Sequence, residues 1–456
     1  MHRARKLRDF RQWAGLGGSG NLRGIALDDG LLEAREVLLP GADQLSPASI
    51  LIDKSSGKII QVQQGELSPD QLGLEVLAVE WIQAGQSVVL PGLVDAHVHL
   101  NEPGRTDWEG FWTGTRAAAS GGITTLVDMP LNSLPPTTTV PNLQTKWKAA
   151  EGQCHTDVAF WGGVIPGNQS SAHLTQLTGI PMYLKGGVTA VNEGLAETHP
   201  VKTTHLSPQE YSTFLTSRPQ ELETNAISLV VELQKEFPKL RCHIVHLSAA
   251  SALPIIREAK SAGLPLTVET CFHYLCLNAE DIPAGHAEFK CCPPVREASN
   301  RDQLWEALKE GLIDCVVSDH SPCVVSLKRP DDGDLMAAWG GISTLGLGLS
   351  LLWTEGKKRG VNLSQVVNWT SKQPAIHAGL ENSKGQLQIA YDGDFVLWDP
   401  EAEFEVTKDL LQYKNKISPY EGMKLQGQVV QTYLRGVKIY DYATGFDGLA
   451  PAGKLI

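Results

Sequence analysis

The segment VVLPGLVDAHVHLNEPG, residues 88–104, decides the fold that we expect for this chain. A run of apolar, β-prone residues ends in the motif DAHVH, which contains His97 and His99. Side chains alternate between the two faces of a strand, so these two imidazoles point to the same side. Imidazole is a common ligand of transition metals. Two imidazoles on one side can clamp a metal ion, but a lone His-x-His at a strand end is more often just a pair of polar residues, so further ligands at other strand ends must decide.

Apolar strands alternate with helical stretches after this segment. The expected strands are residues 88–98, 122–130, 156–165, 242–248, 265–271 and 314–319, and expected helices between them include 109–120, 142–151, 250–262 and 299–310. Such alternation is typical of a parallel α/β sheet. This alternation predicts a (β/α) barrel over residues 91–383, and a length of about 290 residues is usual for that fold.

The two ends of the chain have a different pattern. Short strands separated by turns occupy residues 24–90 and return in residues 384–456. We expect these flanks to pair into one small β-sandwich domain. Residues 1–23 form an N-terminal tail in this interpretation. Its GLGGSG stretch resembles a dinucleotide-binding loop, but it lacks the preceding strand that such a loop needs, so we interpret it as a linker.

Composition excludes several classes of protein. The chain has 456 residues and a net charge of −12, which argues against a nucleic-acid partner. No apolar run reaches the roughly 18 residues of a membrane helix. Eight cysteines in a chain of this length indicate reduced, intracellular thiols. The cytoplasm is the default compartment, and the basic start MHRARKLRDFRQW leaves the mitochondrion or the peroxisome as alternatives.

Other expected strands also end in potential ligands. His246 ends HIVHLS, His273 follows TCF, and Asp319 ends VVSD. Strand ends gather on one face of a barrel, where active sites lie. A metal held there lowers the pKa of bound water and supplies hydroxide. Asp319 is placed to take the proton and to deliver it to a leaving nitrogen, which describes hydrolysis of an amide-like bond.

The motifs together resemble one family of enzymes. They are PGLVDAHVHLNEPGRTDWEGFWTGTRAAASGGITTLVDMPLNS, VETCFHYL, FKCCPPVRE, VVSDHSP and AWGGIS. This combination is similar to the cyclic amidohydrolases, the dihydropyrimidinase-like family, and within it to the allantoinases, over residues 30–440. The resemblance implies a homotetramer of metal-dependent barrels, each with a β-sandwich made from both termini. It also implies two divalent metal ions, with zinc expected, and opening of the hydantoin ring of allantoin to give allantoate.

The resemblance also assigns residues. The matching metal ligands are His97, His99, His246 and Asp319, and Asp319 is also the catalytic base. The residues that it places near the substrate are Asn132, His273, Cys292, Gly340 and Gly341. The carboxylated lysine that bridges the two metals in the family corresponds best to Lys185, which lies 24 residues after Trp161.

One region departs from the family pattern. The expected HAE motif, which supplies a further histidine from strand 5, does not occur between Lys185 and Tyr211. Only 25 residues separate Lys185 from Tyr211, and they would have to supply a helix, a strand and a loop. A βα unit needs about 30 residues or more. We therefore expect an internal deletion around residues 186–208, at most one well-held metal and little activity. A splice variant, a gene-model error or a decaying gene would each produce this pattern.

Two other functions remain open at this point. One is a dihydropyrimidinase or hydantoinase, and the other is a non-catalytic scaffold that has lost its ligands. A scaffold predicts erosion across the whole site, whereas the four ligands named above are all present. Cys271…Cys276 and Cys291-Cys292 are candidate thiolate pairs. We expect no zinc–thiolate site, because Cys291 and Cys292 are adjacent and precede two prolines, a spacing unlike the C-x₂₋₄-C pairs of structural zinc.

Overall fold

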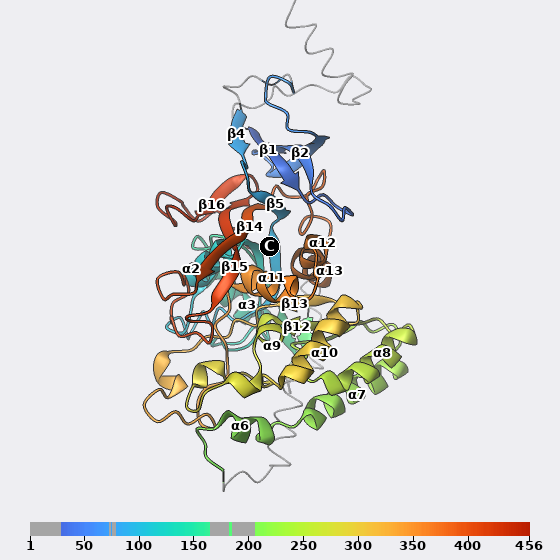
Figure 1. Cartoon of the computed structure of the whole chain (residues 1–456), viewed down its shortest axis with the longest axis vertical. Coiled ribbons are helices and arrows are strands. Elements are labelled where there is room, and N and C mark those ends of the chain that lie inside the picture. Colours follow the sequence, from blue (N-terminus) through green and yellow to red (C-terminus); the bar gives the residue numbers. More distant parts are fainter. Residues whose placement is uncertain (1–28, 73, 75–78, 165–181, 185–205) are drawn as a thin grey trace, which may run out of the picture.

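The computed structural model describes residues 29–72, 74, 79–164, 182–184 and 206–456. A sheet made from both ends of the chain lies at one end of the molecule, and most of the helices lie at the other (Figure 1). The central parallel strands lie between them. None of the described helices combines the length and the apolar character that crossing a membrane requires.

The sheet contains strands from both ends of the chain. Its strands are β1 (Asp29–Val37), β2 (Ser46–Asp53), β3 (Lys58–Gln64), β4 (Val79–Gln83), β5 (Val88–Pro91), β14 (Phe395–Glu405), β15 (Lys424–Leu434) and β16 (Val437–Asp441). β5 pairs antiparallel with β14 and parallel with β1, so it joins the N-terminal strands to the C-terminal ones. Leu32, Ile50, Val89 and Phe395 form part of its buried core. The expectation that both termini build one β unit is confirmed.

The barrel strands follow β5 directly. They are β6 (Leu93–Val98), β7 (Ile123–Asp128), β8 (Asp157–Phe160), β9 (Gly162–Val164), β10 (Met182–Leu184), β11 (Cys242–Ile244), β12 (Leu266–Cys271) and β13 (Cys315–Val317). They form the parallel groups β6–β7–β8, β9–β10 and β11–β12–β13. A parallel bridge between Val98 and His320 brings the end of the last strand back to the first.

Helices follow the strands, as the alternating pattern predicts. The α-helices are α2 (Phe111–Ser120), α3 (Val140–Ala150), α6 (Tyr211–Ser217), α7 (Gln220–Glu236), α8 (Leu253–Ser261), α9 (Phe272–Cys276), α10 (Ala298–Lys309), α11 (Gly348–Lys357), α12 (Leu363–Val367) and α13 (Gln373–His377). Short 3₁₀ turns cover Ala250–Ala252, Ala279–Asp281, Ala287–Phe289 and Val325–Lys328, and a π-turn covers Asn368–Lys372. The predicted boundaries of α2, α3, α8 and α10 agree with the structure to within a few residues.

The predicted disruption of strand 5 falls almost wholly outside the described residues. Lys185 and residues 186–205 belong to the part that the structure does not describe. Among the described strands, no ladder joins β10 to β11. α6 begins at Tyr211, where the resemblance to the family resumes in the sequence. The deletion around residues 186–208 therefore stays a prediction at the level of structure.

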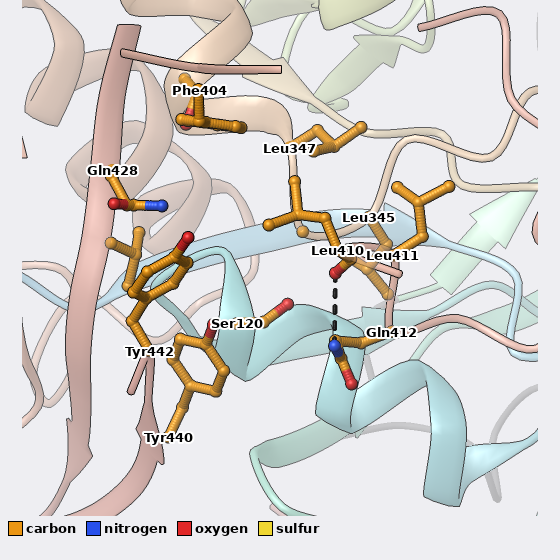
Figure 2. A pocket seen from close by; sticks show the side chains of 13 residues that line it. Ser120, Leu345, Leu347, Phe404, Leu410, Leu411, Gln412, Gln428, Tyr440 and Tyr442 are labelled. Atoms are coloured by element: carbon orange, nitrogen blue, oxygen red, sulfur yellow. Dashed lines mark hydrogen bonds between the residues drawn. The ribbon is translucent and has the colours of Figure 1, made fainter. Parts of the chain in front are cut away.

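A small pocket lies where the sheet meets the barrel helices (Figure 2). It is lined by Ser120, Leu345, Gly346, Leu347, Ser350, Phe404, Leu410, Leu411, Gln412, Gln428, Val429, Tyr440 and Tyr442. Close by, the Thr432 hydroxyl donates to the carbonyl of Ala119 at 2.7 Å. None of the predicted site residues lines this pocket, so we interpret it as part of the joint between the two units.

Candidate metal centre

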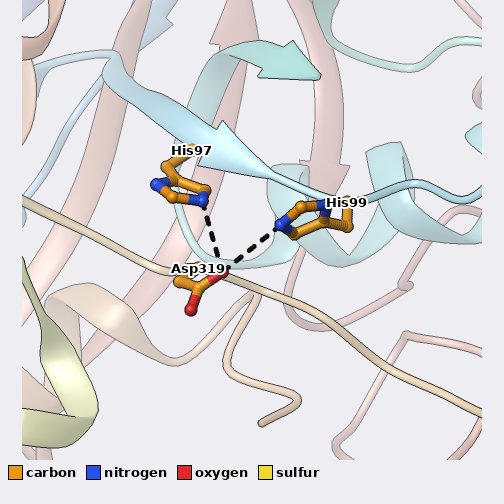
Figure 3. Close-up of side chains that lie close together, drawn as sticks. All are labelled: His97, His99 and Asp319. Carbon is orange, nitrogen blue, oxygen red and sulfur yellow. Dashed lines mark ion pairs between the residues drawn. The ribbon is translucent and has the colours of Figure 1, made fainter. Parts of the chain in front are cut away.

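Three of the predicted ligands meet inside the barrel (Figure 3). His97 and His99 come from the end of β6, and Asp319 follows β13. Oδ1 of Asp319 lies 3.4 Å from Nε2 of His97 and 3.5 Å from Nε2 of His99. One ligand atom from each of the three residues lies within 4.8 Å of the other two. The structure thus brings together side chains that are more than 200 positions apart in the sequence.

The backbone at the strand ends fixes this geometry. The N–H of His99 donates to the carbonyl of His320 at 2.8 Å, which holds β6 against the residues after β13. Asp319 and His246 have φ angles of 41° and 38°. Side chains with a Cβ rarely adopt such values, and when they do the residues are often functional. The turn after each strand therefore directs these side chains at the expense of backbone strain.

A buried carboxylate orients His97. Nδ1 of His97 lies 2.5 Å from Oε1 of Glu269, which is 1% exposed. The same oxygen accepts the N–H of His246 at 3.2 Å, and Oε2 is 3.1 Å from Nε2 of His243. With Nδ1 donating to Glu269, Nε2 is the nitrogen that remains to bind a metal, and this is the usual way that proteins orient a metal-binding histidine.

The sequence did not identify Glu269 as a site residue, although Glu269 belongs to the motif VETCFHYL. The available signal was a carboxylate inside a strand that is otherwise largely apolar, β12. Asp95 was also missed. Its Oδ1 accepts the N–H groups of His97 at 3.3 Å and Ser318 at 3.2 Å, and so connects β6 to the end of β13. Burial raises the pKa of the Asp95 carboxyl to about 6.

The electrostatics of the cluster favour a cation. Burial lowers the pKa of the His97 imidazole, but the carboxylates of Glu269 and Asp319 outweigh it and raise that pKa to about 9. Burial raises the pKa of Asp319, but His97, His99 and His246 outweigh it and leave that pKa well below its ordinary value. Two carboxylates thus converge on one imidazole. A donor set of two imidazoles and a carboxylate fits a divalent transition metal.

The two remaining predicted ligands differ in position. His246 is 4% exposed, and its ring centroid lies 5.4 Å from that of His97. Burial lowers the pKa of His246 to about 4, so its imidazole is neutral. It lies beside the group of three, but its nitrogens are not part of that group. Lys185 lies outside the described residues.

The residues expected near the substrate occupy neighbouring loops. A Cβ at Gly340 would lie 3.1 Å from Sγ of Cys292, and one at Gly341 would lie 2.1 Å from the carbonyl oxygen of Ser321. Only glycine therefore fits at position 341. Its N–H donates to the carbonyl of Lys290 at 2.8 Å, and its own carbonyl accepts from the ammonium of Lys328. These contacts fix the Cys292 and Gly340–Gly341 loops relative to each other.

Asn132 and His273 complete the predicted set. Asn132 has a φ of 70°, and its carbonyl accepts from Arg105 at 3.2 Å. Its neighbour Leu131 has its carbonyl 3.5 Å from Nδ1 of His99, which places this loop next to the metal ligands. His273 is fully buried after β12 and belongs to a ligand group with Cys271 and Asp319.

Comparison with known proteins identifies the family. The amidohydrolase family model matches residues 88–202 and 231–439. An allantoinase from Saccharomyces cerevisiae is 42% identical, over 90% of this chain and 95% of its own length. An allantoinase from Streptomyces avermitilis is 44% identical, over 93% and 98%. A mitochondrial allantoinase from Aquarana catesbeiana is 49% identical, over 67% and 69%.

The alignment with the Saccharomyces allantoinase contains more positions than the number of residues that this chain contributes to it. The comparison with the Saccharomyces protein extends over 449 positions, although it includes only 90% of these 456 residues. The relative therefore carries residues that this chain lacks, which agrees with an internal deletion.

Solved structures support the same fold. The L-hydantoinase (dihydropyrimidinase) from Arthrobacter aurescens has a TM-score of 0.78 at 26% identity and covers 94% of this chain and 97% of its own. The dihydropyrimidinase from Brevibacillus agri has a TM-score of 0.79 at 26% identity, with coverages of 94% and 98%. The expected metal-dependent amidohydrolase barrel is confirmed. With its strand-end histidines and its long matches to curated relatives, the chain belongs to the amidohydrolase family and, within it, to the allantoinases.

Proposed function

We propose that this chain opens the hydantoin ring of allantoin to give allantoate, using one divalent metal ion at His97, His99 and Asp319. One observation carries the proposal: both histidines direct Nε2 at the same oxygen of Asp319. The substrate follows from the membership of the allantoinases. Zinc is the expected metal, because it accepts imidazole and carboxylate ligands and leaves a position open in catalytic sites.

The residues have distinct tasks in the reaction. A divalent metal held by His97, His99 and Asp319 would lower the pKa of a water molecule toward neutrality. Asp319 accepts the proton of the attacking water as the water oxygen bonds to the ring carbonyl carbon. Asp319 then returns the proton to the ring nitrogen as the carbon–nitrogen bond breaks. Glu269 keeps His97 in the tautomer that offers Nε2 to the metal.

The set of metal ligands among the described residues limits the expected rate of allantoin hydrolysis. It provides three ligands for one ion, whereas the family resemblance implies two ions bridged by a carboxylated lysine at Lys185. A second ion on the substrate side would polarise the carbonyl that the water attacks. We therefore expect metal-dependent turnover that is well below that of a complete two-ion centre.

The substrate contacts belong to this proposal as well. We place allantoin against the loops of Cys292 and Gly340–Gly341, with Asn132 on the side of His99. A homotetramer and an intracellular location complete the proposal. The matched Aquarana protein is named as mitochondrial, so the mitochondrion is the first organelle to examine.

A hydantoinase or dihydropyrimidinase activity is the second candidate, since the structural neighbours have those names. A direct test incubates the zinc-loaded chain with allantoin, hydantoin and dihydrouracil in parallel. We expect a ring-opened product from allantoin, and a clear preference for either other compound would reassign the substrate. A chain that binds no metal and turns over none of the three would instead be a scaffold.

A further inference from the structure

A second group of potential ligands shares Asp319. Cys271 ends β12, and His273 lies in the first turn of α9. Ligand atoms of Cys271, His273 and Asp319 lie within 4.8 Å of one another, and all three residues are buried. Asp319 thus belongs to two groups, one with His97 and His99 and one with Cys271 and His273.

Within the described part of the chain, His273 lacks the hydrogen bonds that a buried imidazole normally makes. It is 0% exposed, and neither of its ring nitrogens has a hydrogen-bond partner among the described residues. It contacts the ring of Tyr274 edge-on, with centroids 4.2 Å apart, and that contact satisfies neither nitrogen. Buried polar groups are nearly always hydrogen-bonded, so this pair of nitrogens requires an explanation. Burial lowers the pKa of His273 to about 4, which leaves a neutral imidazole with a lone pair to offer.

Cys271 provides a complementary donor. Its side chain is 0% exposed, and burial, together with Asp319 and Glu269, raises the pKa of its thiol well above the ordinary value. A thiolate therefore forms here only if a cation compensates its charge. The thiolate would add a negative charge to that of the shared carboxylate of Asp319, and neutral His273 adds a third ligand without adding positive charge.

We propose that Cys271, His273 and Asp319 hold a second divalent cation of the thiolate-binding class, such as zinc, cobalt or cadmium. The proposal rests on the proposed function only in sharing Asp319. Tetrahedral ligands of zinc are about 3.3–3.6 Å apart, so small side-chain rotations must close the group. When the ion binds, the S–H bond of Cys271 breaks, its proton passes to water, and a sulfur–metal bond forms.

This inference reverses our expectation from the cysteine pattern. That expectation concerned pairs of cysteines. The structure instead joins one cysteine to a histidine two residues later and to an aspartate from another strand. The resulting ion would share the carboxylate that acts as the base, so we expect it to add nothing to turnover.

Cobalt titration of the full-length chain, stripped of metal by a chelator, tests the proposal. At saturation we expect two cobalt ions per chain and a thiolate-to-cobalt charge-transfer band in the near ultraviolet. The variant Cys271→Ser should lose this band and bind one cobalt fewer. His273→Gln should weaken binding of that ion by about ten-fold or more. The matched control Cys276→Ser, at a buried cysteine that ends the short helix after Cys271, should keep the band.

The outcomes separate this proposal from the proposed function. Saturated wild-type protein without a charge-transfer band would overturn the thiolate site, while allantoin turnover with one cobalt per chain would leave the proposed function intact. A raised KM for allantoin in His273→Gln, with an unchanged band, would show that His273 contacts substrate instead. If Cys271→Ser does not fold, cadmium-113 NMR of the unaltered chain decides, because thiolate ligation shifts the resonance far downfield.

Discussion

Two buried clusters in this molecule consist of potential metal ligands, yet they have different tasks. One joins His97, His99 and Asp319 in the barrel, and the other joins Asp157, Asp392 and Asp394 where the barrel meets the sheet. The second contains its own cation. The ammonium of Lys384 lies 2.6, 2.9 and 2.8 Å from those three carboxylates, and Arg435 also pairs with Asp157.

The first cluster lacks such a partner. The ion pairs of Asp319 within the described part of the chain involve imidazoles and no lysine or arginine. Burial and grouping of ligand atoms are common to both clusters, so neither property identifies a metal site. The difference lies in the source of the positive charge. The ammonium of Lys384 keeps its proton and stabilises the fold, whereas an imidazole such as that of His97 can release its proton and bind a metal ion instead.

Replacing the base should have the largest effect. Asp319→Asn keeps the shape of the side chain but removes both the proton acceptor and the negative charge that faces His97 and His99. We expect allantoate formation to fall by about two to four decades, the usual range for loss of a general base. The measurement is turnover at saturating zinc, with circular dichroism to establish that the variant is folded. Near-full activity would exclude Asp319 as the base.

The other cluster should respond in stability instead. Lys384→Met removes the ammonium that three carboxylates share, although Asp157 keeps Arg435 and Asp392 keeps Lys58. We expect the free energy of unfolding to fall by about 3–5 kcal/mol, chiefly because buried Asp394 loses its cation. Denaturant titration measures this change. The control Lys454→Met removes the same charge from an exposed side chain and should have little effect. A chelator should leave this contribution unchanged, and unaltered stability in Lys384→Met would contradict the structural role.

His155, a buried histidine outside both clusters, provides a third point of comparison. Among the residues that the structure describes, neither of its ring nitrogens has a hydrogen-bond partner, and the ring packs edge-on against Trp112 and Phe446. Burial, with a smaller effect of Arg116, lowers the pKa of His155 to about 4 from 6.5. Between these values the unfolded chain binds more protons than the folded one, so the contribution to stability is complete above pH 6.5. It is lost progressively as the pH falls to 4.

The variant His155→Phe should remove this dependence. From the size of the pKa shift, the parent loses at most about 3 kcal/mol of its free energy of unfolding through His155, and the variant should avoid this loss. Unfolding measured from pH 7 to pH 4 should therefore show a flatter profile for the variant than for the parent. His286→Phe, at an exposed position, is the matched control. Parallel profiles for parent and His155→Phe would show that His155 does not set the acid sensitivity.

The smallest effect is expected for the group that orients His97. Glu269→Gln keeps an acceptor for Nδ1 of His97 but removes its charge. We expect the affinity for zinc to fall by about 10–100-fold, as is usual for a residue that supports a metal ligand. Competition with a chromogenic chelator measures the affinity. Glu306→Gln, at an exposed position of α10, should bind zinc like the parent. Unchanged affinity in Glu269→Gln would assign Glu269 to packing alone.

The sequence predicts local features well, because they follow from short periods. Alternation within a strand placed His97 and His99 on one side, and the alternation of strands with helices placed Asp319 on the same face of the barrel. Contacts between residues far apart in the sequence could not be predicted in this way. Glu269 contacts His97 from 172 positions away, and no local pattern indicates that pairing. The Lys384 cluster and the Cys271–His273 group were missed for the same reason.

The central claim is that one ion at His97, His99 and Asp319 carries out the reaction. Its most direct test adds zinc stepwise to chelator-treated protein and follows allantoate formation together with the zinc bound per chain. We expect no activity without zinc, and a slow turnover that rises in proportion to the first equivalent and does not increase with the second. Activity in metal-free protein would contradict the claim. So would robust activity that appears only at two ions per chain, since Lys185 and a substitute histidine would then have rebuilt a two-ion centre.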